Sequence, residues 1–117
     1  MTNKILDDVY EFLGASYMDG PNGRESTLSG FAPQIKMYVN DSLQTLIQNG
    51  VGKPVDVKDD TTWDDFFGDA KGGRSNAIMY VLLAVNLLFD PPLPSQITLM
   101  KERRDECLWR SRTEFDL

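Results

Sequence analysis

The fold of this 117-residue chain is decided by one apolar stretch, residues 77–89, whose sequence is AIMYVLLAVNLLF. Hydrophobic residues occupy nearly every position, so a helix formed here has no polar side to turn toward water. A helix that is apolar all round is buried, either within its own domain or in an assembly. The stretch therefore predicts a central helix that other segments must cover.

Signals on both sides of this stretch mark where the central helix begins and ends. Ser75 or Asn76 can cap its start. Residues 90–94, with the sequence DPPLP, end it, because proline lacks a backbone donor and disfavours helix at the residue before it. The apolar run is shorter than the ~20 residues that a helix needs to cross a bilayer, so we expect no membrane span.

Three further segments have the spacing of helices that pack one side against this centre. The first, which Thr2 or Asn3 can cap, is stopped near Gly14, and the last is capped by Ser95. The second has a proline in its first turn and Gly50 as a left-handed terminator. The three predicted helices cover residues 3–13, 32–49 and 96–111.

A short helical turn is predicted after Thr61 or Thr62, either of which can cap it. Its apolar side is formed by Trp63, Phe66 and Phe67. These aromatic side chains are expected to fill a gap in the core, and the alternative is an exposed patch for a partner.

The remaining stretches predict connections. Residues 14–30 hold four glycines and one proline and predict a long loop, and residues 51–60 predict an extended or irregular connection. Residues 113–117 have no periodic pattern and predict a C-terminal tail. We thus expect an all-α fold, a small bundle of three to four helices around a buried central helix, with residues 1–112 as a single domain.

Composition excludes several kinds of active site. The chain has no histidine, which excludes Ser-His-Asp and Cys-His catalysis and histidine-bearing metal sites. Its one cysteine, Cys107, cannot form an internal disulfide and is expected to be a small buried hydrophobe. With 12 basic and 18 acidic residues the net charge is −6, which disfavours sequence-independent binding to nucleic acid or to an anionic membrane.

Two charged segments each have two interpretations. The acidic residues between Asp56 and Asp69 suggest a divalent-ion site, but their spacing lacks the calcium-loop pattern, so a solvated loop with helix caps is favoured. The last helix carries five cations, and pairs such as Lys101–Asp105 and Glu106–Arg110 suit a solvated side. Arginine and tryptophan are also enriched where proteins bind one another, so a partner surface is equally expected there.

Four short motifs follow one another in a recognisable order along residues 31–112. They are LIQNGV at residues 46–51, TTWDDF at 61–66, LLFDPP at 87–92 and CLWR at 107–110. Together they resemble the head–tail connector, or adaptor, proteins of long-tailed bacteriophages. The string LLFDPP after an apolar helix, with the tryptophan motif upstream, is the most specific part of this resemblance.

The resemblance implies a small helical virion protein without enzymatic activity, cofactor or metal. Copies are expected to form a ring, about twelve-fold in the virion, beneath the portal protein. The ring would extend the DNA channel and offer a docking platform for the next neck or tail-completion protein. DNA would pass only as cargo, no membrane would be involved, and the protein would occur in the host cytoplasm during assembly and then in the virion neck.

The resemblance and the charge pattern together nominate residues for partner contact, because in such proteins the C-terminal segment commonly reaches the portal or a neighbouring subunit. The nominated residues are Arg103, Arg104, Trp109, Arg110, Arg112, Glu114, Phe115, Asp116 and Leu117. The residues expected to hold the fold are Trp63, Phe66, Leu82, Leu88 and Phe89.

Two hypotheses concern how the chain meets its partners. Head-to-tail rings join two different faces, and complementary charges on the last helix and on residues 56–69 are one way to provide them. An alternative function from another class is a small acidic intracellular regulator that binds its partner as a DNA mimic, which the net charge of −6 permits.

Overall fold

The computed structural model describes residues 3–17 and 31–115, and every regular element in these residues is a helix. The all-α prediction is therefore confirmed. The helices are α1 (Ile5–Tyr17), α3 (Ala32–Gln48), α4 (Trp63–Phe67), α5 (Arg74–Phe89) and α6 (Pro94–Phe115).

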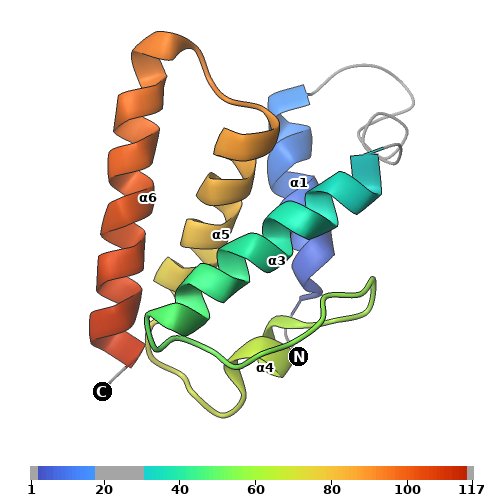
Figure 1. Cartoon of the computed structure of the whole chain (residues 1–117), viewed down its shortest axis with the longest axis vertical. Coiled ribbons are helices and arrows are strands. Elements are labelled where there is room, and N and C mark those ends of the chain that lie inside the picture. Colours follow the sequence, from blue (N-terminus) through green and yellow to red (C-terminus); the bar gives the residue numbers. More distant parts are fainter. Residues whose placement is uncertain (1–2, 18–30, 116–117) are drawn as a thin grey trace.

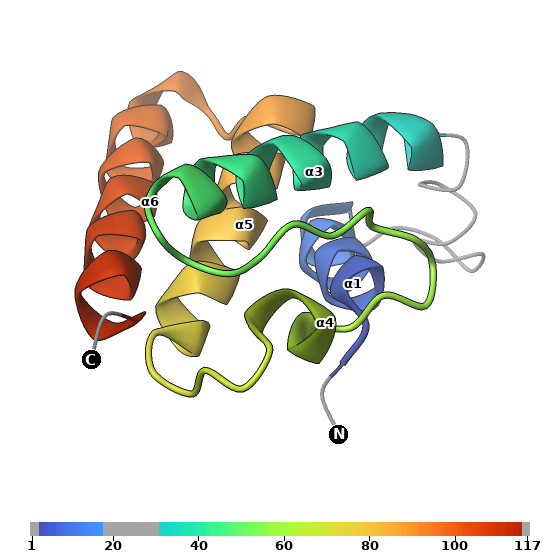
Figure 2. The ribbon, with the colours of Figure 1, turned by 60° about the horizontal axis from the view of Figure 1, so that its bottom comes forward.

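Helix α5 lies at the centre of the bundle, as the sequence predicted. Helix α6 runs beside it in the opposite direction after a short proline-rich turn, and α3 crosses α5 at an angle (Figure 1). Figure 2 shows α3 lying across both α5 and α1, with α4 at the opposite side of the bundle from α3. Among the described residues no helix is both long and apolar enough to span a membrane.

The core consists of the apolar stripes of these helices. α1 contributes side chains such as Ile5 and Leu13, and α3 contributes Ile35 and Leu46, all of which are fully buried. The buried residues of α5 are Ala77, Tyr80, Val81, Leu83, Ala84, Val85 and Asn86. Burying a Leu or Ile side chain contributes about 1.5–3 kcal/mol, so these stripes supply most of the stability.

Helix α1 is longer than predicted. It does not stop at Gly14 but continues to Tyr17, so residues 14–17 of the predicted loop are helical and residues 18–30 lie outside the described residues. Glycine inside a helix costs only about 1 kcal/mol relative to alanine, and Gly14 is buried beside the packed Leu13. Tertiary packing therefore outweighs the local preference.

The beginning of α1 is held against the beginning of α4. The Ile5 amide donates to the Thr61 carbonyl at 2.9 Å, and the indole Nε1 of Trp63 donates to Asp8 Oδ2 at 2.7 Å. An isolated β-bridge joins Lys4 and Thr62, and the connection at 51–60, predicted to be extended or irregular, is irregular. Two segments far apart in sequence are thus fixed side by side.

Helix α4 is a capped aromatic plug. Thr62 and Asp65 form a capping box, in which each side chain accepts a hydrogen bond from the backbone amide of the other. Trp63, Phe66 and Phe67 are all buried, which confirms the core interpretation of this turn.

Helix α5 begins before its predicted caps. It starts at Arg74, after Gly73, so Ser75 and Asn76 lie inside the helix. Gly73 has a positive φ of 79° and a side chain there would meet the Ser111 carbonyl at 2.9 Å, so the close approach to α6 requires glycine. The guanidinium of Arg74 then donates to the carbonyls of Gly68 and Ala70 and pairs with Asp64.

Helix α6 also exceeds its predicted limits. It starts at Pro94, so Ser95 lies in its first turn and is not the cap. It continues to Phe115, and the predicted tail is therefore helical over residues 113–115, while residues 116–117 lie outside the described residues. The half-buried Phe115 ring lies 6.2 Å from that of Phe67, and this packing orders the end of the helix.

One polar side chain, Asn86, is buried between α5 and α6. It is 4% exposed, its amide nitrogen lies 3.5 Å from the sulfur of Met100, and its Oδ1 has no hydrogen-bond partner within the described part of the chain. A buried acceptor without a partner costs about 1–3 kcal/mol.

We predict that Asn86→Leu raises the free energy of unfolding by about 1–2 kcal/mol, because it removes this unpaired acceptor at similar side-chain volume. Asn86→Asp, which places a charge at the same site, should be strongly destabilising. Urea unfolding of the three proteins measures both effects. A loss of stability in Asn86→Leu would contradict the prediction.

Two glycines in the α3–α4 connection provide a matched pair. Gly50 and Gly52 have φ values of 84° and 82°, but a Cβ at Gly50 meets nothing within 4 Å, whereas one at Gly52 lies 2.2 Å from the buried ring of Phe66. Gly50→Ala should cost about 1–2 kcal/mol from backbone strain alone. Gly52→Ala should cost about 1–3 kcal/mol more because the ring must move. Equal losses in chemical denaturation would show that the ring yields freely.

Candidate interaction surface

Helix α6 packs on α5 with one side and leaves the opposite side open. The residues on its inner side are three or four positions apart in the sequence, and they include the buried Cys107 and Ser111. Two large apolar residues on the open side are mostly exposed, Leu99 at 67% and Trp109 at 62%. We call this side the α6 face, formed by Leu99, Glu102, Arg103, Glu106, Trp109 and Arg110.

The charges of the α6 face are arranged around one carboxylate. Glu106 Oε1 lies 3.2 Å from Arg103 Nη1 and 3.1 Å from Arg110 Nη2, which confirms the predicted pair with Arg110. Asp105 pairs with Arg104 at 3.0 Å, where the sequence suggested Lys101. Exposed pairs contribute only about 0–1 kcal/mol each, so these charges orient side chains more than they stabilise the fold.

The other residues nominated for partner contact are placed differently. Arg112 is exposed and Arg104 is half-buried. Glu114 accepts a hydrogen bond from Asn76 Nδ2 at 2.6 Å, and Phe115 packs on the aromatic plug. The structure thus brings Arg103, Trp109 and Arg110 to one open face, while Glu114 and Phe115 tie α6 to the body. Asp116 and Leu117 lie outside the described residues.

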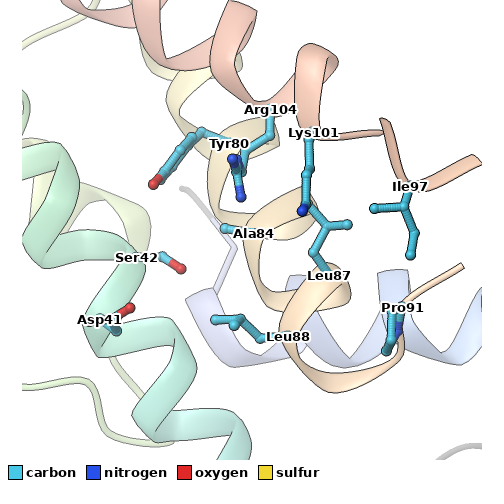
Figure 3. A pocket seen from close by; sticks show the side chains of 10 residues that line it. All are labelled: Asp41, Ser42, Tyr80, Ala84, Leu87, Leu88, Pro91, Ile97, Lys101 and Arg104. Atoms are coloured by element: carbon cyan, nitrogen blue, oxygen red, sulfur yellow. The ribbon is translucent and has the colours of Figure 1, made fainter. Parts of the chain in front are cut away.

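A groove with a volume of about 420 Å³ lies over α5, between α3 and α6 (Figure 3). Its floor comes from Ala84, Leu87 and Leu88 of α5, and Lys101 and Arg104 of α6 point across it. We call this cavity the groove. Its lining residues are Asp41, Ser42, Tyr80, Ala84, Leu87, Leu88, Pro91, Ile97, Lys101 and Arg104.

The prediction that Leu88 helps to hold the core is wrong. Leu88 was predicted to hold the fold but is 50% exposed at the groove, while Leu82 and Phe89 are only half-buried. The cause is the angle between α3 and α6, which diverge and leave part of α5 uncovered. The hydrophobic pattern predicted that α5 needs cover but carried no signal of which side lacks it.

Half of the acidic side chains between Asp56 and Asp69 have partners within the chain. Asp59 pairs with Lys36 at 3.1 Å, Asp64 pairs with Arg74 at 2.6 Å, and Asp65 caps α4. In residues 3–17 and 31–115, no three His, Cys, Asp or Glu side chains are grouped to hold a metal ion. The hypothesis that this segment pairs with α6 of another copy stays a prediction, with part of its charge already neutralised.

Burial raises the pKa of three groups in the part of the chain that the structure describes. The Cys107 thiol, fully buried on the inner side of α6, has a pKa above its usual value because the thiolate would be desolvated. Burial likewise raises the pKa of Tyr80, and burial together with Asp59 raises that of Tyr10. Cys107 therefore stays protonated near neutral pH, as expected of a packed hydrophobe rather than a nucleophile.

The chain is similar to a known protein family. A family model described as "Phage connector protein" matches residues 23–116, which is most of the chain. Neither the search of curated proteins nor that of solved structures finds a match.

We predict that the protein loses stability in alkaline solution. A group with a raised pKa holds its proton more tightly when folded, so its stabilising contribution is complete below the unfolded pKa and is lost as pH rises through the folded one. The free energy of unfolding should fall above pH 9.0, the ordinary pKa of the thiol. In Cys107→Ala the fall should begin nearer the tyrosine value of 10.0. Stability that rises with pH across this range would contradict the prediction.

Proposed function

The chain belongs to the phage connector protein family, and from this membership we propose that it is the head–tail connector of a tailed bacteriophage. In this proposal the protein has a structural and non-enzymatic role in the neck of the virion. Copies form a ring beneath the portal, about twelve-fold in the particle, which extends the DNA channel. The ring also serves as a docking platform for the next neck or tail-completion protein.

The observation that carries the assembly into a ring is the incomplete cover of α5. This helix is apolar on every side, yet Leu88 is half exposed and neighbours such as Leu82 and Leu87 are only partly covered. Exposed apolar surface of this kind drives association, because burying it contributes about 25 cal/mol per Å². Further copies of the chain supply the missing cover.

The charge of the chain supports its place around a DNA channel. A net charge of −6 repels the phosphate backbone, so DNA can slide through the ring as cargo without being held. The α6 face offers both arginines and a tryptophan for protein contact, which suits the portal or a neighbouring copy.

The proposal is tested by assembly and by loss of the gene product. The purified chain mixed with the portal protein should sediment as a complex and appear as a ring on the portal in electron micrographs. Phage particles that lack the protein should fill their heads but fail to join tails and should lose DNA.

Two results would contradict the proposal. One is normal joining of heads to tails and retention of the genome in particles without the protein. The other is a chain that stays monomeric with the portal and competes with DNA for a protein partner, as a DNA mimic would. The portal is required in this assay, since a connector can be monomeric until the portal organises it.

A further inference from the structure

The groove and the α6 face of this chain match each other in apolar character, charge and length. We propose that the groove of one copy receives the α6 face of the neighbouring copy. This contact rests on the proposed ring assembly and defines its interface. Each copy then covers the open side of its neighbour's α5.

The shape of the groove suits a helix as its occupant. α3 and α6 form its two walls and α5 forms its floor (Figure 3). Along α5, the lining residues Tyr80 to Leu88 span about 12 Å, and on the α6 face Leu99 and Trp109 lie about 15 Å apart. Insertion of a helix face into an apolar groove is a recurring mode of recognition between proteins.

Apolar side chains are present on both surfaces. In the groove, Leu88 is half exposed, and Leu87 and Ile97 also line it. On the α6 face, Leu99 and Trp109 are about two-thirds exposed, although large apolar residues are normally covered. Tryptophan is among the residues that dominate the binding energy when they enter a pocket, and leucine adds apolar area to the contact.

The charges on the two walls of the groove are complementary to those on the two edges of the α6 face. The α6 wall of the groove carries Lys101 and Arg104, and the α3 wall carries Asp41. Across the α6 face, Glu102 lies along one edge, whereas Arg103 and Arg110 lie along the other, as the helical spacing requires. A single orientation therefore places Glu102 against the cationic wall and the arginines against Asp41.

Lys101 and Glu102 are the most informative of these charges. Within the described residues neither forms an ion pair, and both are exposed. Every other charge named here except Asp41 already has a partner on its own helix. An ion pair between copies would therefore bring together two side chains that have no competing partner.

The arrangement of the two surfaces leads to a ring. They lie on different sides of the same helix α6, because Ile97, Lys101 and Arg104 line the groove while Leu99 and Glu102 point away from it. One copy cannot fill its own groove with its own α6 face. The contact is thus heterologous, and repetition of a heterologous contact generates a closed ring when the rotation closes.

The test is a charge exchange in the full chain, with assembly on the portal measured by sedimentation. Lys101→Glu and Glu102→Lys should each raise the concentration needed for half assembly by about tenfold, because each places like charges together at every interface. The double variant Lys101→Glu/Glu102→Lys should restore assembly. Leu88→Glu should abolish it by placing a charge on the apolar floor.

Matched controls separate interface effects from general effects of charge and exposure. Lys53→Glu and Asp7→Lys make the same charge changes at exposed positions outside both surfaces and outside residues 56–69, and Leu93→Glu repeats the Leu88→Glu change at a leucine that is 69% exposed. All three controls should assemble like the original chain. Thermal unfolding of each monomer should be nearly unchanged, which shows that the variants fold.

The outcomes distinguish this inference from the proposed function. Rings that form equally well with Lys101→Glu, Glu102→Lys and Leu88→Glu would overturn the interface and leave the connector proposal intact. Single variants that weaken assembly without rescue by the double variant would overturn the pairing of Lys101 with Glu102. If the original chain forms no ring on the portal, the connector proposal fails and the interface fails with it.

Discussion

The structure depends on the need to keep helix α5 out of water. Its residues are apolar on every side, and a helix of this kind is stable only when neighbours surround it. α3 and α6 pack on two of its sides and α1 on another, and together they bury Val81, Val85 and Ala77 completely. The stretch near Leu88 stays half exposed, and in the proposed ring a neighbouring copy covers it.

Local devices at one end of the bundle fix how these helices meet. The capping box of Thr62 and Asp65 starts α4, and the aromatic plug then reaches Phe115 at the end of α6. Arg74 holds the turn before α5 through two carbonyls and one carboxylate. Each device satisfies polar groups that would otherwise be unpaired. Among the described residues only glycines have a positive φ, and one of them, Gly73, lies where α5 approaches α6.

The α6 face combines exposed apolar side chains with paired charges. Arg103 and Arg110 share one carboxylate, which holds both guanidinium groups in defined directions beside Trp109. Such charges contribute little to the stability of the fold but determine which surfaces fit together. In the proposed interface the apolar groove supplies the binding energy, and the charges along its walls set the orientation of the helix that enters it.

The sequence by itself determined the elements whose cause is local. The apolar pattern of residues 77–89 predicted the central helix, Gly50 ended α3 in a left-handed conformation, and Thr62 capped the aromatic turn. Only the tertiary structure decided the extension of α1 through Gly14, the start of α5 after Gly73 and the exposure of Leu88. The physical reason is that these features depend on packing between segments distant in sequence, and the angle between α3 and α6, which creates the groove, is set by that packing alone.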